Sequence, residues 1–73
     1  MRLRTQLSDQ LYDDGGITDF YVIFDSKMPI GVKTISHPDQ GPIKIAYLFR
    51  DQIFGNAEAF LAAYLQSCEA GAA

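Results

Sequence analysis

The segment PIKIAYLFRDQIFGNAEAFLAAYLQSCEAG, residues 42–71, decides the fold, because the spacing of its apolar residues changes halfway along. In the first half they alternate, and those on one side are Ile43, Ile45, Tyr47 and Phe49. Such alternation is typical of an antiparallel strand with one buried face. In the second half they recur at helical spacing, in a stripe of Phe60, Leu61, Tyr64, Leu65 and Cys68. The segment therefore predicts a strand followed by a helix that packs beside it.

The predicted helix covers about residues 57–69 and carries a signal at each end. Asn56 suits the N-cap position, because its side-chain oxygen can accept a hydrogen bond from a free backbone N–H of the first turn. Glu58 lies near the positive end of the helix dipole, and Gly71 is a typical stop residue.

The sequence upstream of residue 42 predicts further strands. Residues 19–25, DFYVIFD, are apolar on both sides, as in a central or doubly covered strand, and residues 30–36, IGVKTIS, form the next. A bulge in residues 30–36 would explain why Ile35 does not continue the alternation of Ile30 and Val32. Turn signals stand at Gly15-Gly16 and at residues 37–41. Residues 2–7 alternate like a strand, although the leucines up to residue 11 also fit a helix; we favour the strand.

These elements predict an α+β fold: a small antiparallel β-meander of three or four strands with one C-terminal α-helix packed on the sheet. The chain has 73 residues and a net charge of −3, with its six basic residues scattered. We expect a single domain, residues 1–73, that binds neither nucleic acid nor membranes directly and is a monomer. One cysteine and the lack of a signal peptide or a long apolar run predict a complete cytosolic protein.

No residue pattern indicates catalysis, a cofactor or a metal site. Asp19 and Asp25 are six residues apart on one predicted strand, which separates them by roughly 20 Å, too far to act on one substrate atom. Asp13 and Asp14 precede the double glycine as ordinary turn residues and lack the spacing of a calcium loop. His37 in a turn and Cys68 on the apolar stripe have no visible third partner. We expect a protein that is not an enzyme.

A binding surface is the remaining interpretation, since one helix can cover only one face of the sheet. The uncovered face would carry either Tyr21 and Ile23 or the other parity of residues 20–24, with acids around it. Exposed apolar patches with a polar rim commonly mark protein contacts. The predicted partner-binding residues are Asp13, Asp14, Asp19, Tyr21, Ile23 and Asp25. Coverage of this face by the N-terminal segment is the competing interpretation.

Two resemblances add candidate functions. The step from IAYLFR, residues 45–50, to IFGNAEAFLAAYL, residues 53–65, resembles the small sheet-plus-helix DNA-binding domains of phage integrases, but the sheet lacks their basic face. In size, acidity and lack of catalytic motifs, the whole chain is similar to the small transcription regulators of lytic bacteriophages of the Xanthomonas phage type. That resemblance implies a protein that binds host RNA polymerase, inhibits initiation and promotes antitermination in the bacterial cytoplasm. The alternative is a phage inhibitor of a host defence complex of the CRISPR type.

Overall fold

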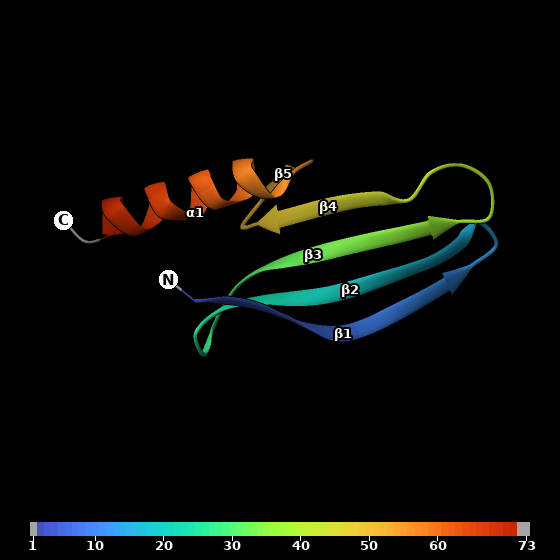
Figure 1. Cartoon of the computed structure of the whole chain (residues 1–73), viewed down its shortest axis with the longest axis horizontal. Helices are drawn as coiled ribbons and strands as arrows, with labels where there is room; N and C mark the ends of the chain where they lie inside the picture. The colour runs from blue at the N-terminus through green and yellow to red at the C-terminus, as the bar shows by residue number, and fades with distance from the viewer. Residues whose placement is uncertain (1, 72–73) are drawn as a thin grey trace.

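The computed structural model describes residues 2–71, which form a five-stranded antiparallel sheet and one helix (Figure 1). The strands are β1 (Leu3–Asp13), β2 (Gly16–Asp25), β3 (Met28–Pro38), β4 (Lys44–Phe49) and β5 (Gln52–Phe54), and the helix is α1 (Ala57–Gly71). Each strand pairs with its neighbours in the sequence, in the order β1-β2-β3-β4-β5. The predicted α+β meander with a C-terminal helix is confirmed, with five strands in place of three or four.

Strand register divides the side chains between two faces, because cross-strand partners share a face and successive residues alternate. We call the side that α1 packs against the helix face and the opposite side the open face. Ile23 and its partners Thr5 and Gly31 belong to the helix face, and Val22 with its partners Gln6 and Val32 belongs to the open face. This assignment decides which of the predicted contact residues are accessible.

Two bulges adjust the register. In β1 the extra residue is Ser8, between Leu7 and Asp9, and it moves Leu11 to the open face and Tyr12 to the helix face. The N-terminal segment is therefore a strand, and its leucines do not form one stripe. In β3 the extra residue is Ile30, at the start of the segment where the broken parity had indicated a bulge.

Helix α1 begins where the sequence predicted. The Asn56 side chain accepts a hydrogen bond from the Ala59 backbone N–H at 2.8 Å, which caps the first turn. The helix packs on the sheet through Phe60 and Tyr64, which are buried together with Ile23 and Phe49. Phe49 meets the rings of Phe60 and Tyr64 edge to face, with centroids 6.0 and 6.1 Å apart. These four side chains are the core.

Gly31 explains how the helix can lie so close to the sheet. A Cβ atom at this position would stand 2.6 Å from the Leu48 carbonyl oxygen and 2.8 Å from Cε1 of Phe60. Phe60 is only 2% exposed, so its ring occupies the space that any other residue at position 31 would need. The Phe60 ring thus packs directly against the backbone of Gly31, which carries no side chain.

The helix covers only one end of the sheet (Figure 1). It packs beside β4 and β5, and its C-terminal part extends beyond the strands, so that the molecule measures 47 × 21 × 18 Å. Leu65 and Cys68, which the sequence placed on the buried stripe, are therefore exposed, Leu65 by 44%. Ile43 and Ile45 are exposed by 59% and 43%, because α1 does not extend over that end of the sheet (Figure 1).

Candidate functional site

The part of the helix face that α1 leaves uncovered is an exposed apolar surface. The register places six apolar side chains there, and Ile43 precedes β4 next to them. We call these seven residues the distal patch: Leu7, Tyr12, Ile17, Tyr21, Ile35, Ile43 and Ile45. Five of the seven are exposed, with Tyr12 at 68% and Ile43 at 59%. Large apolar side chains gathered in this way are typical of a contact surface.

Asp19 lies within the distal patch and is held by two neighbours. Its carboxylate accepts a hydrogen bond from the Gln10 side-chain amide at 2.7 Å, and its other oxygen lies 3.1 Å from Nε2 of His37. The Asp19 side chain is only 13% exposed, whereas that of His37 is 44% exposed. Asp19 is thus a partly covered polar group inside the patch, where the sequence had predicted an exposed acid on its rim.

The rim acids are found at the end of the sheet farthest from the helix. Asp13 and Asp14 lie at the turn between β1 and β2, and Asp39 follows β3 beside them, because its backbone N–H donates to the Gly15 carbonyl at 2.9 Å. All three residues are exposed, and we call them the acidic tip. Asp13 and Asp14 therefore keep the position that the sequence predicted, next to the apolar surface.

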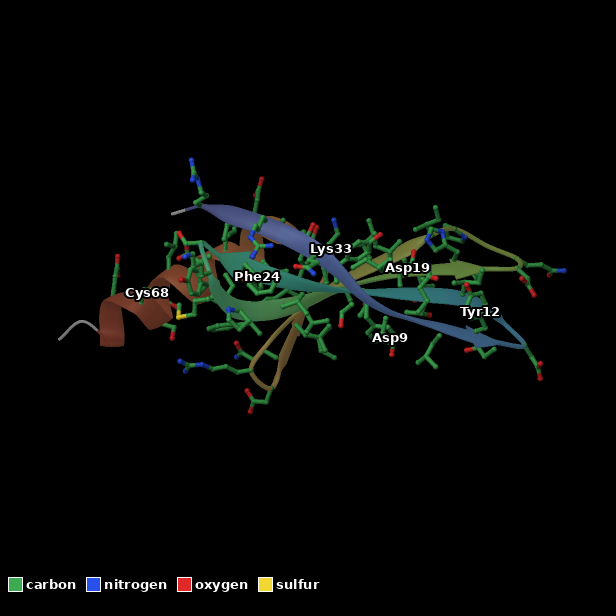
Figure 2. All side chains as sticks on the ribbon, turned by 90° about the horizontal axis from the view of Figure 1, so that it is seen from below. Asp9, Tyr12, Asp19, Phe24, Lys33 and Cys68 are labelled. Atoms are coloured by element: carbon green, nitrogen blue, oxygen red, sulfur yellow. The ribbon has the colours of Figure 1, made fainter. Side chains whose placement is uncertain are left out.

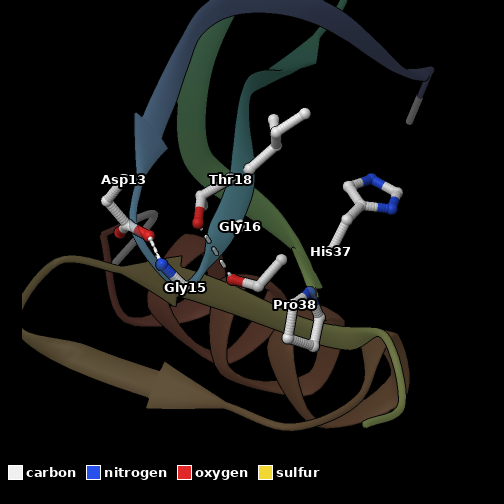
Figure 3. A pocket seen from close by; sticks show the side chains of 8 residues that line it. Asp13, Gly15, Gly16, Thr18, His37 and Pro38 are labelled. Carbon is white, nitrogen blue, oxygen red and sulfur yellow. Dashed lines mark hydrogen bonds between the residues drawn. The ribbon is translucent and has the colours of Figure 1, made fainter. Parts of the chain in front are cut away.

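The turn at the acidic tip has its own internal hydrogen bonds (Figure 3). The Asp13 carboxylate accepts the Gly15 backbone N–H at 2.7 Å, and the Thr18 and Ser36 hydroxyls are 3.3 Å apart. The hollow beside them, about 210 Å³, has Gly16 in its wall, and a Cβ atom there would stand 2.2 Å from the His37 carbonyl oxygen. Because these polar groups form hydrogen bonds with one another, we interpret the hollow as the end of a β-hairpin.

Ile23 and Asp25 do not belong to the candidate site. Ile23 is 4% exposed beneath α1, so its predicted role as an accessible contact is wrong. Asp25 accepts the Tyr64 hydroxyl at 2.5 Å and the Arg2 backbone N–H at 3.2 Å, and it ties the helix to the end of β2. These bonds, the one from Tyr64 foremost, hold the pKa of Asp25 below its usual 3.8, and the Asp25 carboxylate raises the pKa of Tyr64.

The six predicted contact residues therefore separate into three places. Asp13 and Asp14 are at the tip, Asp19 and Tyr21 lie in the distal patch, Ile23 lies in the core, and Asp25 is hydrogen-bonded to the helix. Sequence reasoning missed the contributions of β1, β3 and β4 to the patch. Each of these strands has apolar residues at alternate positions. Only the strand register shows that these residues lie on the same face and form one surface.

The structure also keeps apart the residues that a catalytic dyad or a metal site would need close together. Cys68 and Asp19 lie toward opposite ends of the long axis (Figure 2), and His37 is bonded to Asp19, so no cysteine–histidine pair forms. Among residues 2–71, no three His, Cys, Asp or Glu side chains are grouped to hold a metal ion. No helix in the same range has the length and apolar character to cross a membrane.

A scan against protein-family models, a search of curated proteins and a search of solved structures each gave no match to this chain.

Proposed function

We propose that this chain is a small protein-binding regulator that docks on its partner through the distal patch. The observation that carries the proposal is the incomplete cover of the helix face: α1 ends its contact near Tyr47 and Phe49, and the apolar rows beyond them are open. A chain of this size has little apolar surface to spare, since burial is what stabilises it. Large apolar side chains in the open are best explained by a partner that covers them.

The acidic tip at one end of the distal patch supports a partner with basic residues beside an apolar element; Lys33, the cross-strand partner of Tyr21, lies at the other end. The acidic tip contributes three exposed carboxylates at one end of the patch, and the Asp19 carboxylate faces His37 within it. Rim charges of one sign speed the encounter with an oppositely charged partner and disfavour wrong ones. This arrangement supports a protein partner over a nucleic acid, whose phosphates the tip would repel.

For the partner we propose a bacterial RNA polymerase, with the chain acting in the bacterial cytoplasm as an inhibitor of initiation and a promoter of antitermination. Support for this choice comes from the resemblance in size and acidity to small phage transcription regulators. The proposed mode of action is steric and needs neither catalysis nor a cofactor: one apolar surface and a few rim charges suffice to cover an element of the enzyme.

The first test measures the contact itself. Tyr12→Ser and Ile43→Ser remove exposed apolar groups from the patch, and each should weaken partner binding by about tenfold or more without loss of folding. Met28→Ser is the matched control, because Met28 is 55% exposed outside the patch. Equal effects of all three substitutions, or none from the first two, would contradict docking through this surface.

The rim charges are tested separately. Asp14→Lys should slow association and reduce its dependence on salt, because steering by surface charge is screened by ions. Asp51→Lys provides the control, since Asp51 is exposed at the turn between β4 and β5, away from the tip. Asp19 is unsuitable for this purpose, because its replacement would also remove the hydrogen bonds to Gln10 and His37.

The identity of the partner is tested by promoter-dependent transcription with purified bacterial polymerase, with and without the chain, alongside affinity capture from a bacterial lysate. Reduced initiation or readthrough at a terminator, lost in the Tyr12→Ser variant, is the expected result. Neither effect, together with the absence of polymerase subunits from the captured proteins, would refute the polymerase as partner. Capture of subunits of a defence complex would instead support the inhibitor alternative.

A further inference from the structure

The open face of the sheet presents a second apolar surface, on the side opposite the distal patch. One row of residues crosses all five strands in register: Gln6, Val22, Val32, Leu48 and Ile53. Phe24 lies beside this row on one side and Phe20 on the other. The helix packs on the other face, so these side chains are covered only by their neighbours in the sheet.

Charged residues on β1 flank the two phenylalanines. Arg4 is the cross-strand partner of Phe24, and its guanidinium lies 4.2 Å from the centre of that ring. Asp9 is the cross-strand partner of Phe20, and its carboxylate accepts the neighbouring Gln10 backbone N–H. Neither forms an ion pair within residues 2–71, where the pair between His37 and Asp19 is the one present. Arg4 and Asp9 thus stand at equal register steps on either side of the central row, and Asp13 and Lys44 lie farther along the same face.

We propose that a second copy of this chain packs on the open face, related by a two-fold axis that runs along the central row. Under this symmetry Val22, Val32 and Leu48 each face their own copies. Phe24 then faces Phe20 of the other copy, and Arg4 faces Asp9 of the other copy, so that each of these contacts forms twice. The central part of the surface, between Arg4 and Asp9, is therefore complementary to itself in both apolar and charged groups, as an isologous interface requires.

The shape of the open face favours the same arrangement. Two hollows of about 290 Å³ flank Val22; one is lined by Phe24 and the other by Phe20, and both reach the bulge at Ser8. A two-fold axis through Val22 sets each phenylalanine of one copy against the hollow beside the other phenylalanine of its partner. Inner faces of packed sheets interdigitate in this manner, with the strands of both sheets roughly aligned.

The area fits a weak dimer. Five strands at about 4.8 Å spacing span about 20 Å, and the face from Arg4 to Leu11, six register steps because Ser8 is a bulge residue, extends about 20 Å along the strands. Each copy therefore offers about 400 Å², or about 800 Å² for the pair, which is the size of a weak, transient interface. The dimer has two sheets inside and a helix on each outer side, so both distal patches stay accessible. The inference does not rest on the proposed function.

The test exchanges the charges in separate variants. Arg4→Asp and Asp9→Arg each place like charges together at both ends of the interface, so each should raise the dimer dissociation constant by about tenfold or more. An equimolar mixture of the two variants should form a heterodimer, because both contacts are then complementary. Analytical ultracentrifugation over a concentration series measures the association, and native mass spectrometry identifies the mixed species by mass.

Controls with the same charge changes are Lys27→Glu and Asp39→Arg, at exposed turns away from the open face, and both should dimerise like the wild type. Circular dichroism checks that every variant is folded. The inference is overturned if the wild type remains monomeric at about 1 mM, or if it dimerises while both charge variants dimerise equally well. It is also overturned if the mixed variants fail to restore association, because that would exclude the proposed pairing of Arg4 with Asp9.

Discussion

Replacing Gly31 by alanine should destabilise the fold strongly, although alanine is normally the better residue in a strand. Its Cβ would lie 2.6 Å from the Leu48 carbonyl oxygen and 2.8 Å from Cε1 of Phe60. To reach an ordinary contact of 3.4 Å, these distances must widen by about 0.8 and 0.6 Å. The carbonyl belongs to the strand paired with β3, and the ring is buried, so neither can move without disturbing the core.

The magnitude follows from this geometry. Overpacking a core costs about 1–3 kcal/mol, and we expect about 3 kcal/mol because one of the two obstructing atoms is backbone. A domain of 73 residues is stable by about 4–11 kcal/mol in all. With a urea dependence of about 1 kcal/mol per molar for so small a protein, the unfolding midpoint should fall by about 3 M. Urea titration followed by circular dichroism measures this shift.

Gly55→Ala is the matched control. A Cβ atom on Gly55 meets nothing within 4 Å, so this change should be neutral or stabilise by about 0.5 kcal/mol through the unfolded chain. If Gly31→Ala unfolds at the same urea concentration as Gly55→Ala, the reasoning that the helix needs a bare backbone at Gly31 is refuted.

Three further predictions concern the core, the helix attachment and a turn. Phe60→Ala should cost about 3–5 kcal/mol in urea unfolding, whereas Leu65→Ala, on the same helix but 44% exposed, should cost far less; similar losses would contradict the overhang of α1. Because Asp25 has a lowered pKa, its contribution to stability is present above pH 3.8 and lost as the pH falls through the folded-state pKa; Tyr64→Phe should flatten this loss in acid titrations of the melting temperature, and an unchanged profile would argue against it. Ser26 has φ of 57°, so Ser26→Gly should raise the unfolding free energy by about 1 kcal/mol, and a lower melting temperature would contradict this.

The elements that could be predicted from the sequence are those encoded by neighbouring residues. Alternation over residues 43–49 predicts β4, and Asn56 with the apolar spacing after it predicts the start of α1, because each depends on local periodicity or a local hydrogen bond. The three-residue strand β5 was missed because it is too short to show any period. It exists because the β4 hairpin returns Ile53 against Leu48.

The candidate site was harder to predict, since it depends on where the helix stops along the sheet. Tyr21 and Ile23 have the same parity, yet the first belongs to the distal patch and the second to the core. Nothing in their local sequence distinguishes them; the difference arises from Phe60, almost forty residues later, which packs over one row and leaves the next uncovered. The partial cover of Asp19 likewise comes from Gln10 and His37 on neighbouring strands.

The order of the strands has a consequence for how the chain folds. Because every strand pairs with the one before it, each hairpin can form from residues already close in the chain, and the loops that must close are short. Such a low contact order favours rapid folding for a β-rich protein. The principal distant contacts are those of Phe60 and Tyr64 with β2 and β3, such as the bond to Asp25 across 39 residues. The docking of α1 is therefore the step in which the chain closes its longest loops, and we expect it to limit the folding rate.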